Sequence, residues 1–154
     1  CAVGLVRIED GRIVEKVSKL IRPPRDSFKY TSIHGMSWID VVDKPDFGEV
    51  WHEVQNMRQG IETYVAHYAA FDKRVLDSCI GRYGLKRDMI PFLCTARIAR
   101  QVWNLNPASL PNVCRILNIE LDHHDPLSDA VASAKILIAA CKSYQTSGRT
   151  YVGK

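Results

Sequence analysis

Residues 65–72 read VAHYAAFD, and the residue types in this stretch predict a strand that gives way to a helix. The apolar residues of 61–66 predict a short strand, and apolar side chains recur at helical spacing over 71–83. Gly84 follows as a stop signal for that helix. Asp72 therefore lies in the first turn of a helix that directly follows a strand, an order typical of layered α/β domains.

The segment before this stretch predicts a β-hairpin. Apolar residues in 3–8 and 13–17 flank Asp10-Gly11, a pair that favours the positive φ angles of a tight hairpin turn. Pro23-Pro24 ends the second strand, because proline cannot donate to a strand ladder. We expect an irregular segment over 25–47.

The remaining segments complete an alternation of helices and strands. Gly60 ends a predicted helix, and Ser109 is a plausible N-cap for another. The last helix is rich in alanine, so we expect it to dock closely on a mixed sheet. The further predicted elements are helices over 47–58, 95–103, 109–117 and 127–144 and a strand over 90–94.

Composition limits the classes of protein that the chain fits. Its 154 residues, 46% of them hydrophobic, suffice for one domain with a core. No apolar run has the length of a membrane span, and a net charge of +4 permits a polyanionic partner without requiring one. Five widely spaced cysteines without a Cys-x-x-Cys pair predict reduced thiols in a cytoplasmic protein, most of them packed as small hydrophobes.

Two aspartates stand out because each begins a helix. Asp72 follows a strand, and Asp129 lies in the first turn of the last helix. A carboxylate at a helix N-terminus is favoured by free N–H groups, so each aspartate taken alone is more simply explained as a cap. His124 lies five residues before Asp129, and its presence favours a functional site over a helix cap. Converging carboxylates bind Mg²⁺ or Mn²⁺, and a nearby histidine can act as general base toward water.

Several motifs together resemble the DEDDh exonucleases, the group that includes the proofreading epsilon subunit of bacterial DNA polymerase III. HYAAFD is similar to the second motif of that family, and HHDPLSDA is similar to the third. SIHGMSW, KPDFGEVW and FLCTARIAR resemble further family segments. The resemblance covers nearly the whole chain. It implies a ribonuclease H-like mixed sheet flanked by helices, in a metal-dependent 3′–5′ exonuclease that acts on nucleic-acid 3′ ends.

The resemblance assigns metal binding and proton transfer to individual positions. Asp72 and Asp129 match metal-ligand aspartates for two Mg²⁺ or Mn²⁺ ions. His124 matches the general base, and His123 is the alternative, with a spacing to Asp129 that is one residue too long. His67 opens the second motif and is expected to support the strand end.

The resemblance also implies contacts to substrate. His34, Gly35 and Met36 match a segment that borders the terminal nucleotide in relatives, although a core position for Met36 is about equally favoured. Tyr68 replaces the usual Asn of the second motif, and base stacking and space filling are equally favoured for it. Phe71, a further candidate contact, fits the core better than a stacking platform.

One family motif is missing. The Asp-x-Glu of the first strand, which supplies two of four acidic ligands, does not occur before the hairpin. Glu9-Asp10 lies in the hairpin turn and cannot substitute. We therefore expect residues 1–154 to form a single exonuclease-like domain that is N-terminally incomplete, lacks the central strand, and has negligible activity as it stands.

Alternative functions remain open at this stage. A domain of this fold that has lost its acidic pair would bind single-stranded DNA or RNA, or dock on a DNA polymerase, without catalysis. An unrelated α/β domain with two helix-capping aspartates is disfavoured, because four family-like segments occur in order. The residues do not distinguish DNA from RNA, a proofreading from an independent enzyme, or one oligomeric state from another.

Overall fold

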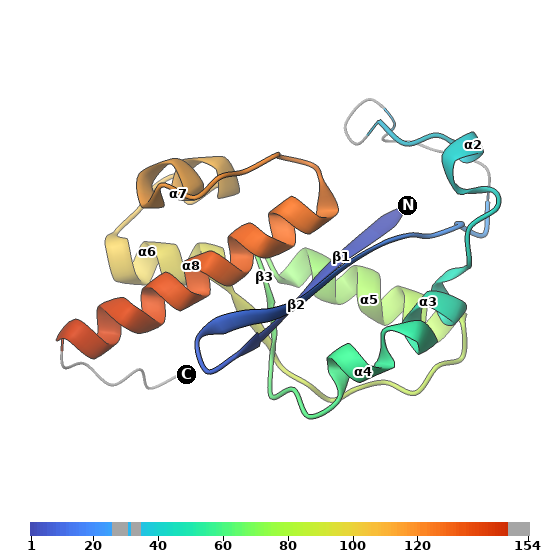
Figure 1. The fold of residues 1–154 in the computed structure, drawn as a ribbon, viewed down its shortest axis with the longest axis horizontal. Coiled ribbons are helices and arrows are strands. Elements are labelled where there is room, and N and C mark those ends of the chain that lie inside the picture. Colours follow the sequence, from blue (N-terminus) through green and yellow to red (C-terminus); the bar gives the residue numbers. More distant parts are fainter. Residues whose placement is uncertain (26–30, 32–34, 148–154) are drawn as a thin grey trace.

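The computed structural model of the protein describes residues 1–25, 31 and 35–147, and it begins with the predicted hairpin (Figure 1). Strands β1 (Ala2–Glu9) and β2 (Arg12–Leu20) pair antiparallel. Asp10 and Gly11 form the turn with φ angles of 48° and 71°. These are the positive angles that a two-residue hairpin turn requires, so the hairpin prediction is confirmed.

A second pair of strands lies at the centre of the chain. Strands β3 (Tyr64–Ala66) and β4 (Phe92–Cys94) are parallel, with α5 (Ala70–Arg82) in the connection between them. Each sheet has two strands, and within the described residues no ladder joins one sheet to the other. The α/β class is confirmed, with the strands divided into an antiparallel and a parallel pair.

The helices follow the predicted order with two corrections. The helix expected over 47–58 is divided at Val54, whose ψ of 15° interrupts the helical backbone. A one-turn helix within the segment expected to be irregular was missed, because four residues are too few to show a 3.6-residue period. The helices besides α5 are α2 (Trp38–Val41), α3 (Phe47–Glu53), α4 (Gln55–Arg58), α6 (Thr95–Trp103), α7 (Leu110–Leu117) and α8 (Pro126–Ser147).

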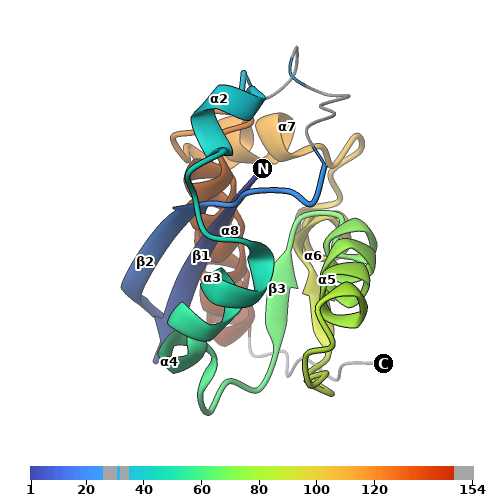
Figure 2. The ribbon, with the colours of Figure 1, turned by 90° about the vertical axis from the view of Figure 1, so that its right-hand side faces the viewer.

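Helix α8 holds the two sheets together. It packs against β1, β2 and β3 and also against α6 and α7 (Figures 1 and 2). Ala132 and Ile136 of α8 are fully buried with residues of α6 and α7. A second core lies between the hairpin, α3 and α5, where Val50, Trp51 and Ile80 are buried. The two cores flank the sheets, as a layered α/β domain requires.

The approach of β1 to α8 depends on a glycine. A Cβ atom added at Gly4 would lie 2.1 Å from the carbonyl oxygen of Pro126. Only a residue without a side chain allows the two backbones to come this close. The hairpin therefore packs directly against the first turn of α8, which is part of the third motif.

Two smaller predictions concern the cysteines and a helix cap. Cys114 is buried, and Cys79 and Cys94 are half-buried against the two cores, whereas Cys1 and Cys141 are exposed, so the prediction that most cysteines pack as small hydrophobes is confirmed. Ser109 occupies the N-cap position of α7, but its side chain makes no capping hydrogen bond. Within the described residues, no helix has both the length and the apolar character to cross a membrane.

Candidate active site

The first turn of α8 is capped by Asp125. Its Oδ2 accepts a hydrogen bond of 2.7 Å from the backbone N–H of Ser128, and Pro126 occupies the first helical position. The Ser128 hydroxyl accepts a 2.8 Å hydrogen bond from the N–H of Asp122. The capping role considered for Asp129 thus belongs to Asp125, and the Asp129 carboxylate is available for other contacts.

The histidine pair of the third motif lies beside that carboxylate. Nδ1 of His123 is 3.2 Å from Oδ1 of Asp129. His124 has a φ of 78°, and its ring stacks on that of His123 with centroids 3.9 Å apart. One ligand atom from each of the three residues lies within 4.8 Å of the others. His124, the predicted base, is therefore at the site, but His123 makes the direct contact with Asp129.

Asp72 lies in the first turn of α5, where it does not act as the N-cap. Removal of water by neighbouring protein atoms, and then the negative charge of Asp129, raise the pKa of the Asp72 carboxyl above its ordinary value. The residue as a whole is exposed, so solvent screens part of this effect. The two aspartates come from segments 57 residues apart, and the fold brings their charges into interaction.

His67 uses both ring nitrogens within the protein. Nε2 lies 2.9 Å from the carbonyl oxygen of Ala108, and Nδ1 lies 2.9 Å from the hydroxyl of Thr95. A carbonyl only accepts, so Nε2 carries the hydrogen, and the neutral ring accepts at Nδ1 from the Thr95 hydroxyl. Burial lowers the pKa of His67, which favours this neutral form. Both nitrogens are occupied, in agreement with a supporting role and not with metal binding.

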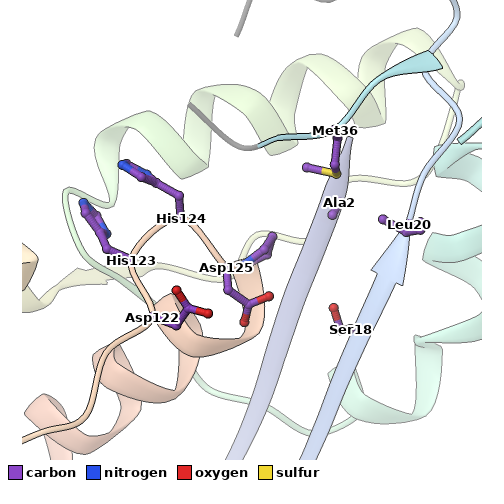
Figure 3. A pocket seen from close by; sticks show the side chains of 9 residues that line it. Ala2, Ser18, Leu20, Met36, Asp122, His123, His124 and Asp125 are labelled. Carbon is purple, nitrogen blue, oxygen red and sulfur yellow. The ribbon is translucent and has the colours of Figure 1, made fainter. Parts of the chain in front are cut away.

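A hollow of about 370 Å³ opens between the hairpin and the loop before α8 (Figure 3). Met36 lines it opposite the loop that carries His123 and His124. Gly35 is exposed, with a φ of 69°, and His34 lies outside the described residues. Met36 is thus at the site and half-buried, a placement compatible with both roles considered for it. The other lining residues are Ala2, Ser18, Leu20, Asp122, Asp125 and Pro126.

Two aromatic side chains stand at the start of α5. Tyr68 has a φ of 62°, is 47% exposed, and meets the ring of His67 edge-on with centroids 4.9 Å apart. Phe71 is 62% exposed, so the prediction that it belongs to the core is wrong. It lies in the first turn of α5, and the core contacts of that helix come from residues nearer its C-terminal end, such as Ile80.

The supporting residues were partly missed from the sequence. Thr95 is fully buried and belongs to the FLCTARIAR segment, but its bond to His67 crosses 28 residues and has no local signal. Asp125-Pro126 does carry a local signal, since Asp at N-cap followed by Pro at the first helical position is a common helix start. This pair of residues predicts Asp125 as the N-cap of the last helix, which leaves Asp129 without a capping role.

The chain is similar to known proteins in both sequence and structure. The sequence model of the Exonuclease family (RNase T) matches residues 1–137, nearly the whole chain. The chain belongs to the RNase T exonuclease family. The expected ribonuclease H-like architecture is likewise supported by a solved structure of exonuclease X in complex with duplex DNA carrying a 5′ overhang. That structure superposes with a TM-score of 0.71 and 29% identity, over 97% of this chain and 84% of the other.

Two known bacterial proteins are also similar in sequence. Exodeoxyribonuclease 10 of Escherichia coli strain K12 is 34% identical over 145 residues, covering 88% of this chain. The chain spans 59% of the length of that relative. The epsilon subunit of DNA polymerase III from Aquifex aeolicus is 31% identical over 142 residues, covering 88% of this chain and 68% of the subunit.

Proposed function

We propose that this RNase T family domain belongs to a metal-dependent enzyme that removes nucleotides from the 3′ end of DNA. The observation that carries the proposal is the convergence of Asp72 with Asp129 and the histidine pair, from two segments far apart in the chain. A non-catalytic domain that had kept only the fold would have no chemical need to hold two carboxylates close together. Burial raises the pKa of Asp72 and repulsion from Asp129 adds to that effect, and a cation between the carboxylates would relieve the repulsion.

Asp72 and Asp129 would hold the divalent ions, Mg²⁺ or Mn²⁺, since hard cations prefer oxygen ligands. Such ions stabilise the attacking and leaving oxygens of a phosphodiester displacement. His124 would accept a proton from the attacking water, with its ring oriented by stacking on His123. His67 would keep the end of β3 and the start of α6 in place beneath the site.

We further propose that an additional strand carrying Asp-x-Glu completes the site. Strand β1 pairs only with β2, and β3 pairs only with β4, within the described residues. Both strands nevertheless pack against the same helix, α8. A strand placed between β1 and β3 would satisfy both unpaired edges and would bring two more carboxylates near Asp72 and Asp129. Residues 1–154 alone are then expected to show negligible turnover.

Contacts to substrate are proposed for the start of α5 and for the segment around Met36. Tyr68 and Phe71 offer exposed aromatic faces on which bases of a single strand would stack. Met36, which lines the hollow, and its neighbour Gly35 would border the terminal nucleotide. DNA is favoured over RNA as substrate because exonuclease X, the structural relative, is solved with DNA. A polymerase partner is a further proposal, suggested by the polymerase III relatives.

The test is hydrolysis of a 3′-labelled single strand by the domain with an Asp-x-Glu segment restored ahead of β1. We expect metal-dependent release of nucleotides, lost by orders of magnitude in Asp72→Asn and in Asp129→Asn. Asp77→Asn is the matched control, because Asp77 lies on the same helix as Asp72 and pairs with Lys73 and Arg87 at the surface. Its turnover should equal that of the unaltered enzyme.

Full turnover in Asp129→Asn would contradict the catalytic assignment. Binding of the labelled strand without any hydrolysis, in the presence of metal and of the restored segment, would instead identify a non-catalytic nucleic-acid-binding module of the same fold. Degradation of an RNA strand in preference to DNA would overturn the substrate assignment alone.

A further inference from the structure

The ligand set at the start of α8 contains two imidazoles and one carboxylate. One ligand atom each from His123, His124 and Asp129 lies within a span of 4.8 Å. Mg²⁺ prefers oxygen ligands, whereas imidazole nitrogen suits Zn²⁺ and neighbouring transition metals. We propose that these three residues form a binding site for a transition-metal cation, of which Zn²⁺ is the representative. This site goes beyond the oxygen-ligand site of the proposed nuclease.

The distances fit a small metal ion. In a tetrahedral site with bonds of about 2.0–2.1 Å, neighbouring ligand atoms lie roughly 3.3 Å apart. Nδ1 of His123 and Oδ1 of Asp129 are 3.2 Å apart. The ligand nitrogen of His124 lies within 4.8 Å of the other two ligand atoms, and rotation about the side-chain bonds of this exposed residue would bring it closer.

The backbone brings the two histidines to the same side. Consecutive residues of an extended chain point in opposite directions, yet the rings of His123 and His124 stack at an interplanar angle of 25°. The φ of 78° at His124 reverses the chain and turns the second ring toward the first (Figure 3). A histidine in this backbone region is uncommon, and such residues concentrate at functional sites.

The loop that carries the pair is held at both ends. The N–H of Asp122 bonds to the Ser128 hydroxyl, and the N–H of Ser128 bonds to the Asp125 carboxylate. The ligands are therefore presented on an ordered turn that is anchored to α8. Three protein ligands leave one position of a tetrahedral ion open to water, as in catalytic zinc sites.

The site has a consequence that rests on the proposed function. Asp129 and His124 are the proposed metal ligand and general base, so a transition metal bound by all three residues would withdraw both from catalysis. Micromolar Zn²⁺ should then inhibit the complete enzyme in competition with Mg²⁺. Binding itself is measured without hydrolysis, so its outcome is independent of whether the domain is a nuclease.

The experiment is calorimetric titration of residues 1–154 with Zn²⁺ and with Mg²⁺ under reducing conditions, together with absorption spectra of the Co²⁺ form. We expect one equivalent of Zn²⁺ to bind at least tenfold more tightly than Mg²⁺. His123→Ala and Asp129→Asn should each lower the Zn²⁺ affinity at least tenfold. The conservative His123→Gln should do the same, and it guards against loss of fold in the alanine variant.

Two variants are matched controls. His52→Ala removes an exposed histidine on α3, and Cys1→Ser removes the exposed thiol next to Ala2, which lines the hollow. Both should bind Zn²⁺ as the unaltered chain does, and the Co²⁺ spectrum should lack thiolate charge-transfer bands. Unchanged Zn²⁺ affinity in His123→Gln, loss of binding in Cys1→Ser, or thiolate bands would each overturn the proposal.

Discussion

His67 donates a hydrogen bond from Nε2 to the carbonyl of Ala108, 41 residues further along the chain, at 2.9 Å. With the bond from the Thr95 hydroxyl to Nδ1, it ties the end of β3 to the start of α6 and to the segment before α7. The charges of Asp129 and His123 both act on this ring, so it lies near the third motif as well. One side chain of the second motif thus positions three parts of the site.

Removal of this ring should destabilise the fold. His67→Ala leaves the Ala108 carbonyl, in a fully buried residue, without its donor, and we expect the free energy of unfolding to fall by about 1–3 kcal/mol. Urea denaturation measures this loss. His67→Gln can still donate to the carbonyl and should recover part of it, whereas His52→Ala, at an exposed position, should have no effect.

The same histidine makes stability depend on pH. Its pKa is lower in the folded chain than in the unfolded chain, so below about pH 6.5 the unfolded state binds more protons. Stability should therefore be complete above that pH and should decline as the pH falls through it. In His67→Gln this part of the decline should disappear; an identical pH profile in both chains would contradict the assignment.

The ionised carboxylate of Asp72 should destabilise the folded state when no metal is bound. Its raised pKa means that the folded state favours the protonated carboxyl, so its stabilising contribution is lost as the pH rises through the folded-state pKa. Asp72→Asn is expected to raise the melting temperature at neutral pH and to leave it nearly unchanged at about pH 3. Carboxyl NMR titration should also show a lower pKa for Asp72 in Asp129→Asn, because the neighbouring charge is gone.

Gly4 should not tolerate a methyl group. A Cβ atom there meets the backbone of Pro126 and Leu127, which cannot move as a flexible side chain would, and we expect Gly4→Ala to cost about 1–3 kcal/mol. Gly81→Ala is the control, because a Cβ at this position of α5 meets nothing within 4 Å. Alanine should stabilise that helix by up to about 1 kcal/mol. Equal effects of both substitutions would contradict the close approach.

Tyr64 should titrate well above the ordinary pKa of a tyrosine. Burial, followed by the hydrogen bond to Asp88 and the negative charge of that residue, raises its pKa to about 12. Ultraviolet titration should assign that step to Tyr64 by its absence in Tyr64→Phe, and Asp88→Asn should lower the pKa while burial keeps it above 10. Because the folded state favours the protonated phenol, its contribution to stability should be lost as the pH rises through this pKa.

Phe71 should contribute to binding of single strands. Loss of base stacking in Phe71→Ala is expected to weaken binding by about 1–3 kcal/mol in fluorescence anisotropy with a labelled oligonucleotide. Met89→Ala is the control, since Met89 is 89% exposed but precedes β4, at the opposite end of the parallel pair from the site. Equal losses in both variants would point to a nonspecific effect.

Local residue patterns account for most of the elements. The Asp10-Gly11 turn, the strand-to-helix change before Asp72 and the bounds of α6 follow from backbone preference and from apolar spacing, which act between residues close in the chain. The types of residue at the site could be predicted in the same way, because the third motif places His124 and Asp129 only five residues apart.

Tertiary structure decided the features that depend on distant contacts. The choice of His123 as the partner of Asp129 depends on the reversed backbone at His124, and the exposure of Phe71 depends on which side of α5 the core covers. The pKa of Asp72 depends on a charge 57 residues away. Burial, desolvation and interactions between charges depend on distance in space, and a sequence pattern records only distance along the chain.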